Sequence, residues 1–148
     1  MTRIDFYILA ESAADNRLMF TCRLADKVYN KGHRIYIHTE SQDQAARLDE
    51  LLWTFSAGNF LPHGVCGDSL DTNLPIHIGC ANELSVPGDG ADSIEVLINL
   101  APSVPLFFSR FARVAEIVDQ EADNRLKGRE RFRFYRDRGY TLESHTIS

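Results

Sequence analysis

Residues 3–38 read RIDFYILAESAADNRLMFTCRLADKVYNKGHRIYIH, and this stretch decides the fold. Apolar residues alternate with polar ones over residues 3–9, which predicts a strand. Apolar residues three and four positions apart predict a helix over residues 15–31, and Gly32 is typical of the residue that follows a helix. A second strand is predicted over residues 34–38. This strand–helix–strand order is typical of parallel strands joined by a crossover helix.

The remaining sequence continues the alternation of helices and strands. It predicts a helix that is capped by Ser41 and ends near Trp53, followed by a mostly loop region over residues 55–75. Strands are predicted over 74–78 and 94–99, with a connection over 85–92 between them. A helix over 106–118 and a last helix over 121–140 complete the chain. We therefore expect one α/β domain over residues 1–148. Its three layers would contain a mostly parallel sheet of the nucleotide-binding-like (Rossmann-like) type.

The charge of the chain is distributed unevenly. The 148 residues carry a formal net charge of −5, whereas residues 121–140 contain seven Lys/Arg and four Asp/Glu, a local charge of +3. An acidic protein with positive charge gathered on one segment is expected to have an anionic partner there. The acidic balance argues against a general duplex-DNA binder, whose affinity depends on many phosphate contacts.

The sequence does not indicate a membrane or a secreted protein. No apolar run approaches the roughly 18 residues of a membrane span. Residues 1–9 read as a strand and not as a signal peptide, and three cysteines do not make a disulfide framework. We expect a cytoplasmic protein with no membrane partner.

Nucleotide chemistry is suggested only by the predicted fold. Residues 10–15, AESAAD, contain no glycine and two carboxylates. Phosphates need bare backbone N–H groups at a helix start, so we expect no phosphate-binding loop. No catalytic triad can be assigned, and a nucleotide-handling enzyme is the third of three hypotheses because fold does not imply function. We expect no catalysis and no cofactor.

Two His-x-x-Cys pairs raise the question of a zinc site. His63 and Cys66 form one pair, and His77 and Cys80 form the other, with ligand types that zinc accepts. Against this, residues three apart on a strand point to opposite faces of a sheet, and His77 lies in a predicted strand. The other interpretation is loop histidines with small buried thiols, so no metal is expected.

The basic helix carries a stripe of arginine and aromatic side chains. Arg125, Gly128, Arg129 and Phe132 follow three- and four-residue steps and therefore share one face. An aromatic ring beside guanidinium groups could hold an apolar group that carries a carboxylate, which arginine binds with two parallel hydrogen bonds. Two alternatives remain: a solvated helix with its aromatic side chains in the core, or a module that binds single-stranded nucleic acid through this helix.

A second unusual region is aromatic. Trp53 ends a predicted helix, and Phe60, Pro62 and His63 follow in the next loop. These residues either close the core or form an exposed patch of the kind that anchors a protein partner. The sequence does not decide between the two.

Together these segments resemble the chi-subunit family of the bacterial DNA polymerase III clamp-loader assembly. The resemblance covers nearly the whole chain, and its order and spacing are specific. The matching segments are Asp5–Tyr7, Lys31–Ile35, Arg47–Trp53, Phe60–His63, Ile94–Leu100 and Arg129–Arg136.

The resemblance implies a non-catalytic adaptor that bridges two proteins. One is the psi subunit of the clamp loader, and the other is the acidic, Phe-ending C-terminal tail of single-stranded-DNA-binding protein, so that DNA is reached only indirectly. The positions that match the tail site are Val118, Arg125, Arg129 and Phe132. The positions that match the psi site are Trp53, Phe60, Pro62 and His63. A repair helicase is an additional partner that the resemblance suggests for the psi surface.

Three features depart from the family pattern. Phe132 stands where members often carry Tyr, which keeps the ring but removes a hydroxyl. Arg125 replaces a Lys. The segment 85–92 is acidic where it can be basic in other members, which argues against a role in recruiting nucleic acid.

Overall fold

The structure is a computed structural model that describes residues 2–10, 16–54, 62–65, 74–80 and 94–147. Within these residues the helices are α1 (Asn16–Asn30), α2 (Gln42–Thr54) and α3 (Ala122–Asp137), with a 3₁₀ turn, η2, at Phe108–Arg110. The strands are β1 (Arg3–Leu9), β2 (Ile35–His38), β3 (His63–Val65), β4 (Ile76–Gly79), β5 (Val96–Asn99), β6 (Arg113–Val118) and β7 (Thr141–Ile147).

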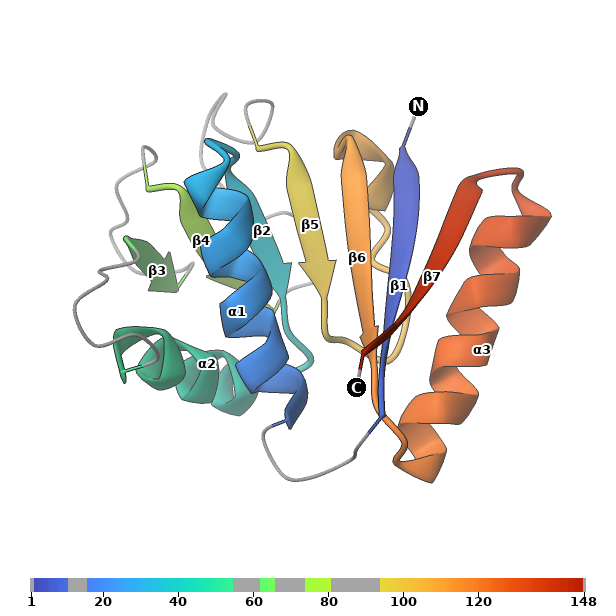
Figure 1. Ribbon diagram of the computed structural model, residues 1–148, viewed down its shortest axis with the longest axis horizontal. Helices are drawn as coiled ribbons and strands as arrows, with labels where there is room; N and C mark the ends of the chain where they lie inside the picture. The colour runs from blue at the N-terminus through green and yellow to red at the C-terminus, as the bar shows by residue number, and fades with distance from the viewer. Residues whose placement is uncertain (1, 11–15, 55–61, 66–73, 81–93, 148) are drawn as a thin grey trace.

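The strands form one seven-stranded sheet in the order β3-β4-β2-β5-β6-β1-β7, and each pair of neighbours is parallel. Figure 1 shows α1 and α2 in front of the sheet and α3 beside β7. The four-residue strands β2, β4 and β5 are buried throughout, as expected of central parallel strands with both faces covered. The predicted three-layer α/β fold is confirmed.

Two cores lie on opposite faces of the sheet. The first contains the buried side of α1 and α2, with Cys22, Ala25 and Leu48 fully covered. The second is aromatic and contains Phe6 of β1 and Tyr135 of α3 among other rings. Side chains alternate along a strand, so β1 contributes to both cores and supports α3 on one face only.

The predicted helix over residues 106–118 is wrong. The structure has η2 followed by strand β6, which lies between β5 and β1 in the sheet. Residues 114–118 read VAEIV and are buried on both faces, so this strand has the near-continuous apolar pattern of a central parallel strand. The aromatic residues before it sit in the core beside α3, and their three- and four-residue spacing imitated a helix.

The end of the chain was also predicted wrongly, because α3 does not complete it. Gly139 adopts φ +81°, which reverses the backbone after α3, and β7 then pairs with β1 along its whole length. β7 is an edge strand with no buried residue. It therefore lacks the apolar signal by which strands are recognised. β3, in a region predicted mostly as loop, is only three residues long.

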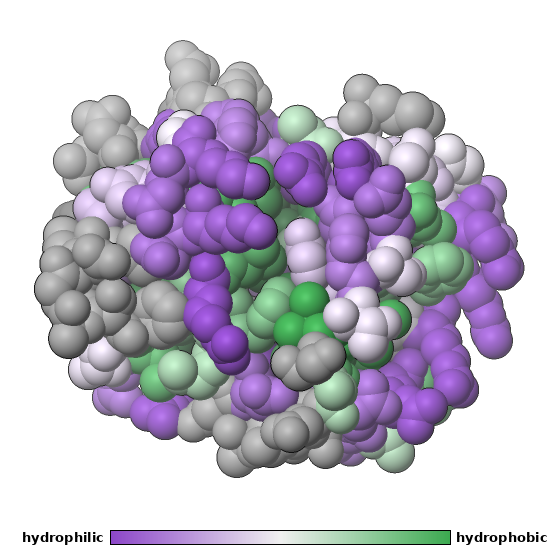
Figure 2. Space-filling view, in the orientation of Figure 1, coloured by the Kyte–Doolittle hydropathy of each residue, from purple (hydrophilic) through white to green (hydrophobic). Residues whose placement is uncertain are grey.

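The surface on the α1 side is largely hydrophilic, with apolar atoms visible in a recess at its centre (Figure 2). Among the described helices, none has the length and apolar character needed to cross a membrane.

Candidate tail-binding groove

A groove of about 350 Å³ runs between α3 and the sheet. Its floor is apolar and comes from β1 and β6, while α3 supplies one wall. The residues that line it are Phe6, Ile8, Val118, Gln120, Arg125, Gly128, Arg129, Phe132 and Ser144. All four residues that the sequence assigned to a tail site therefore lie in a single groove.

Gly128 allows α3 to approach the floor of the groove. A Cβ atom at this position would lie 2.9 Å from Cγ2 of Val118, closer than carbon atoms normally approach. Phe132 follows one turn later and packs edge-on against Phe6, with ring centroids 5.3 Å apart. Close packing of the helix against β6 and β1 thus places Phe132 at the apolar floor and Arg129 at the rim.

Acidic side chains stabilise the start of α3. The carboxylate of Glu121 accepts hydrogen bonds from the backbone N–H groups of Asp123 and Asn124, both at 3.2 Å. Asp119 accepts from the backbone N–H of Glu121 and from the amide of Asn124. Negative groups are favourable at this end of a helix because of its dipole.

A buried polar network that the sequence reasoning missed anchors the middle of α3. Glu116 of β6 is 0% exposed and accepts hydrogen bonds from Nε of Arg131 at 2.7 Å and from the hydroxyl of Tyr135 at 2.6 Å. Asn99 of β5 donates to the same carboxylate, and Arg131 also donates to the carbonyl of Pro102. Burial, followed by the adjacent Glu116 charge, raises the pKa of Tyr135 well above its ordinary value.

Because of this network, Arg131 does not add to the positive charge that α3 presents at the surface. Arg131 is 4% exposed and is held in an internal ion pair, so it cannot attract a partner. Within the described part of the chain, neither Arg125 nor Arg129 has a side-chain hydrogen bond or ion pair, and both are exposed. The positive charge at the groove therefore comes from these two residues.

The aromatic side chains of α3 belong mainly to the core. Tyr135 is fully buried, and Phe134 is half-buried beneath the guanidinium of Arg138, 3.6 Å from the ring centroid. The ring of Tyr135 is therefore closed to a base, and one face of the Phe134 ring is covered by Arg138. This placement disfavours the hypothesis that α3 is a nucleic-acid-binding element.

Three of the residues assigned to the psi surface, Trp53, Pro62 and His63, lie at the opposite end of the sheet. Trp53 lies in the last turn of α2 and is 56% exposed, and its ring centroid is 4.7 Å from that of His63 on β3. Nε2 of His63 contacts a carboxylate oxygen of Asp49 at 3.0 Å. Pro62 directly precedes β3 and is half-buried, whereas Phe60 lies outside the described residues.

Of the residues considered for zinc, the three that the structure describes, His63, His77 and Cys80, do not form a group of possible metal ligands. His77 is fully buried in β4, and its register partner on β3 is Gly64, next to His63. Cys66 lies outside the described residues, and so does most of the segment considered for a phosphate loop, 11–15.

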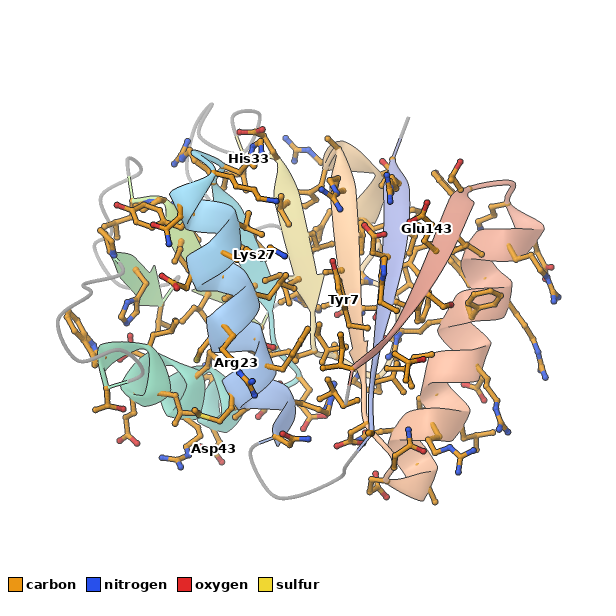
Figure 3. The ribbon with its side chains drawn as sticks, viewed as in Figure 1. Tyr7, Arg23, Lys27, His33, Asp43 and Glu143 are labelled. Carbon is orange, nitrogen blue, oxygen red and sulfur yellow. The ribbon has the colours of Figure 1, made fainter. Side chains whose placement is uncertain are left out.

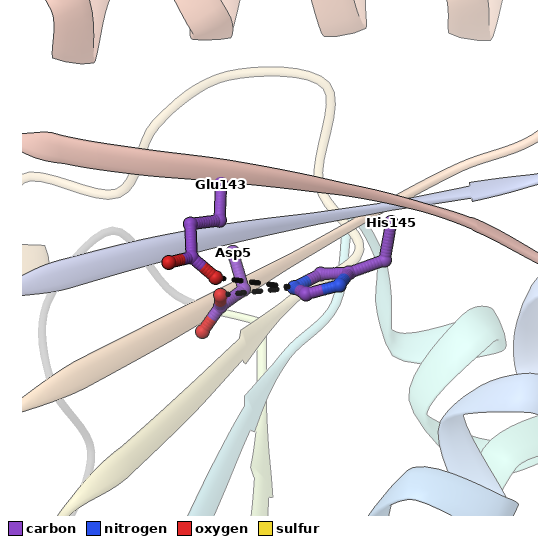
Figure 4. A group of neighbouring side chains, drawn as sticks. All are labelled: Asp5, Glu143 and His145. Carbon is purple, nitrogen blue, oxygen red and sulfur yellow. Dashed lines mark hydrogen bonds and ion pairs between the residues drawn. The ribbon is translucent and has the colours of Figure 1, made fainter.

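Another group of possible metal ligands does come together, in the open part of the sheet near Tyr7 and Glu143 (Figure 3). Ligand atoms of Asp5, Glu143 and His145 lie within 4.8 Å of one another (Figure 4). However, Arg113 donates to Asp5 at 2.9 Å and Arg3 donates to Glu143 at 2.6 Å. The carboxylates are already neutralised, so this arrangement is better suited to an ion-pair cluster than to a cation site.

The ion-pair cluster sets the protonation of Asp5. Burial is the largest influence and raises the pKa of this carboxyl, but hydrogen bonds from Arg113 and His145, together with the charges of Arg113 and Arg3, outweigh burial and lower the pKa below its ordinary value. The same contact with Asp5 raises the pKa of Arg113.

The fold is that of a Rossmann-like α/β protein, and it carries a cationic groove with an apolar floor between a helix and the sheet. The family model for the DNA polymerase III chi subunit, HolC, matches residues 1–143. The chain belongs to this family, whose members are accessory subunits of the replicative polymerase.

Relatives cover nearly the whole chain. The DNA polymerase III subunit chi of Pseudomonas aeruginosa is 37% identical over 147 residues, which are 99% of this chain and 98% of that protein. The subunit chi of Escherichia coli K12 is 29% identical over 150 residues, 99% of each chain.

Solved structures support the fold alone. The crystal structure of T4 UvsW has a TM-score of 0.69 at 13% identity, and the match spans 99% of this chain but 41% of UvsW. The C-terminal domain of the DEAD-box protein Dbp5 has a TM-score of 0.61 at 11% identity, covering 96% of this chain and 90% of that domain.

Proposed function

We propose that this chi-family subunit is a non-catalytic adaptor that links the psi subunit of the clamp loader to single-stranded-DNA-binding protein. In this proposal the tail groove receives the acidic C-terminal tail of the binding protein. The psi subunit docks on the surface around Trp53, Phe60, Pro62 and His63. The observation that carries the proposal is the meeting of Val118, Arg125, Arg129 and Phe132 in one groove.

The chemistry of the groove fits a peptide that ends in Phe. Phe6, Val118 and Phe132 give an apolar floor for the terminal ring. Arg129 stands beside this floor and would bind the terminal carboxylate with its two-donor fork. Arg125, one turn earlier on the same wall, would attract the acidic residues that precede the Phe.

Binding of a labelled acidic peptide with a C-terminal Pro-Phe tests the groove. Arg129→Ala removes a charge-assisted contact of about 1.5–3 kcal/mol, so we expect affinity to fall roughly 10- to 150-fold. Amidation of the peptide's C-terminus should weaken wild type similarly and affect Arg129→Ala little. Arg133→Ala is the matched control, because this exposed arginine lies on α3 outside the groove.

Separate surfaces predict separate losses. Arg129→Ala should leave psi binding intact, and Trp53→Ala should abolish psi binding while leaving the peptide affinity unchanged. Loss of both interactions in both folded variants would refute two independent sites. If Arg129→Ala and Arg133→Ala lowered the peptide affinity equally, binding would be due to general charge attraction and not to the groove.

A further inference from the structure

The two faces of β1 serve different surfaces of the molecule. Phe6 and Ile8 point into the tail groove, whereas Asp5 and Tyr7 point to the opposite face of the sheet, beside α1. In the described part of the chain no helix lies in front of β6, β1 and β7 on this side (Figure 1). The open area is therefore back to back with the tail groove.

A hollow of about 150 Å³ lies where α1 borders this open area. Its charged lining is mostly cationic, with Lys27 on α1, Lys31 just after the end of this helix, and Arg113 on β6. Tyr7 forms part of the floor. Figure 3 shows Arg23 and Lys27 on the side of α1 that faces the viewer, with His33 near its C-terminal end.

The acidic groups around the hollow already have partners. Asp5 accepts from Arg113 at 2.9 Å, and Glu95 contacts His33 at 2.5 Å. In contrast, Arg23, Lys27 and Lys31 are exposed and have no ion pair among the described residues. An excess of positive charge thus remains on one face of a chain whose net charge is −5.

The three cations form a regular row. They are four residues apart, so they project from one side of α1 and its C-terminal end at intervals of about 6 Å. We call this the α1 basic row. Across the open sheet lies an aromatic pair, in which His145 stacks on Tyr7 with ring centroids 5.0 Å apart. The His145 side chain remains 39% exposed.

We propose that this face binds an extended single strand of nucleic acid. Phosphates lie along the α1 basic row and in the hollow, and a base stacks on the exposed ring of His145. Sites for single strands combine a cationic track with aromatic platforms in this way. An acidic peptide would use the cations but not the ring face. This direct contact goes beyond the expectation that DNA is reached only through a partner protein.

Fluorescence anisotropy with labelled oligo-dT and the full chain tests the proposal. We expect weak binding at low salt, with a log–log salt slope of roughly −2, since about three phosphate contacts contribute about 0.7 each. Replacing Arg23, Lys27 and Lys31 together by Gln should weaken binding at least about 10-fold. Replacing Arg125, Arg129 and Arg133 by Gln removes the same charge from α3 and should change affinity less than about twofold.

Comparing the two triple variants distinguishes a specific site on the α1 face from an effect of net charge. Equal weakening by both would attribute binding to net charge and overturn the proposal, and so would wild-type protein that does not bind oligo-dT at low salt. Poly-glutamate that binds as tightly as oligo-dT would assign the face to an acidic protein instead. The result is independent of the tail groove, because the α1 variant retains every groove residue.

Discussion

The buried network that anchors α3 makes a quantitative prediction. Arg131→Met keeps most of the side-chain volume but leaves the carboxylate of Glu116 buried without its cation, since Glu116 is 0% exposed. Removing one partner of a buried ion pair costs about 3–5 kcal/mol. For a chain of this size the loss corresponds to a fall in melting temperature of roughly 10 °C.

The reverse substitution gives a double-mutant cycle. Glu116→Gln should cost a similar free energy of unfolding, because it leaves the guanidinium of Arg131 buried without an anion. The double variant has neither buried charge, and the amide oxygen introduced at position 116 still accepts from Tyr135. We therefore expect a loss of about 2–4 kcal/mol and not the sum of the two single losses. Urea denaturation of the four proteins measures the coupling.

Peptide binding shows whether the network also holds the groove in shape. Arg131 adjoins Phe132 on α3, so a loosened helix should lower tail-peptide affinity at a temperature where all variants are folded. Leu48→Ala is the matched control, since it costs about 2–5 kcal/mol in the core on the other face. Additive costs in the cycle, or equal affinity losses in Arg131→Met and Leu48→Ala, would refute this reasoning.

Three further predictions address other parts of the molecule. Gly128→Ala places a methyl group against Val118, and this overpacking costs about 1–3 kcal/mol. The higher helix propensity of Ala offsets about 1 kcal/mol of that cost. Calorimetry should therefore show a small loss of stability, and peptide titration should show weaker binding. Trp53→Ala should alter the free energy of unfolding little, because the side chain is 56% exposed, while a psi pull-down shows lost binding; a large drop in melting temperature would contradict this. Because the folded state lowers the pKa of Asp5, the ionised carboxylate stabilises the fold above pH 3.8, and this contribution is lost as the pH falls through the folded-state pKa. In Asp5→Asn the free energy of unfolding should therefore depend less on pH below about pH 4, as urea denaturation at a series of pH values would measure.

The sequence predicted the elements whose patterns are local. Alternation in residues 3–9 and the helical period before Gly32 located β1 and α1 to within a residue or two. The strand β6 was predicted as a helix because a strand buried on both faces has no alternation. β7 was missed because an edge strand needs little apolar content. In both cases tertiary position, and not local propensity, decides the pattern.

The candidate site was predicted only in part, because helical spacing is a local pattern and the packing of α3 on the sheet is not. Helical spacing brings Arg125, Arg129 and Phe132 to one face, and the groove contains all three. The floor residues of β1 and the partner of Arg131 could not be predicted, because they depend on how α3 packs against the sheet. The one available signal was Glu116 inside the apolar segment 114–118, since a buried carboxylate is rare unless a cation pairs with it.

The number of arginines on α3 does not show how many of them can bind a partner. Arg131 lies between Arg129 and Arg133 in the sequence, yet it is buried while both neighbours are exposed. Residues two apart on a helix lie about 200° apart around its axis, so Arg131 points away from both Arg129 and Arg133, whereas Arg129 and Arg133 differ by one turn along the axis. A scan of this helix should therefore separate into three effects: Arg131 controls stability, Arg129 controls tail affinity, and Arg133 changes neither. If Arg131 behaved like either neighbour, α3 would sit on the sheet in a different rotation from the one described, and if Arg133 behaved like Arg129, the tail would be held by general charge attraction.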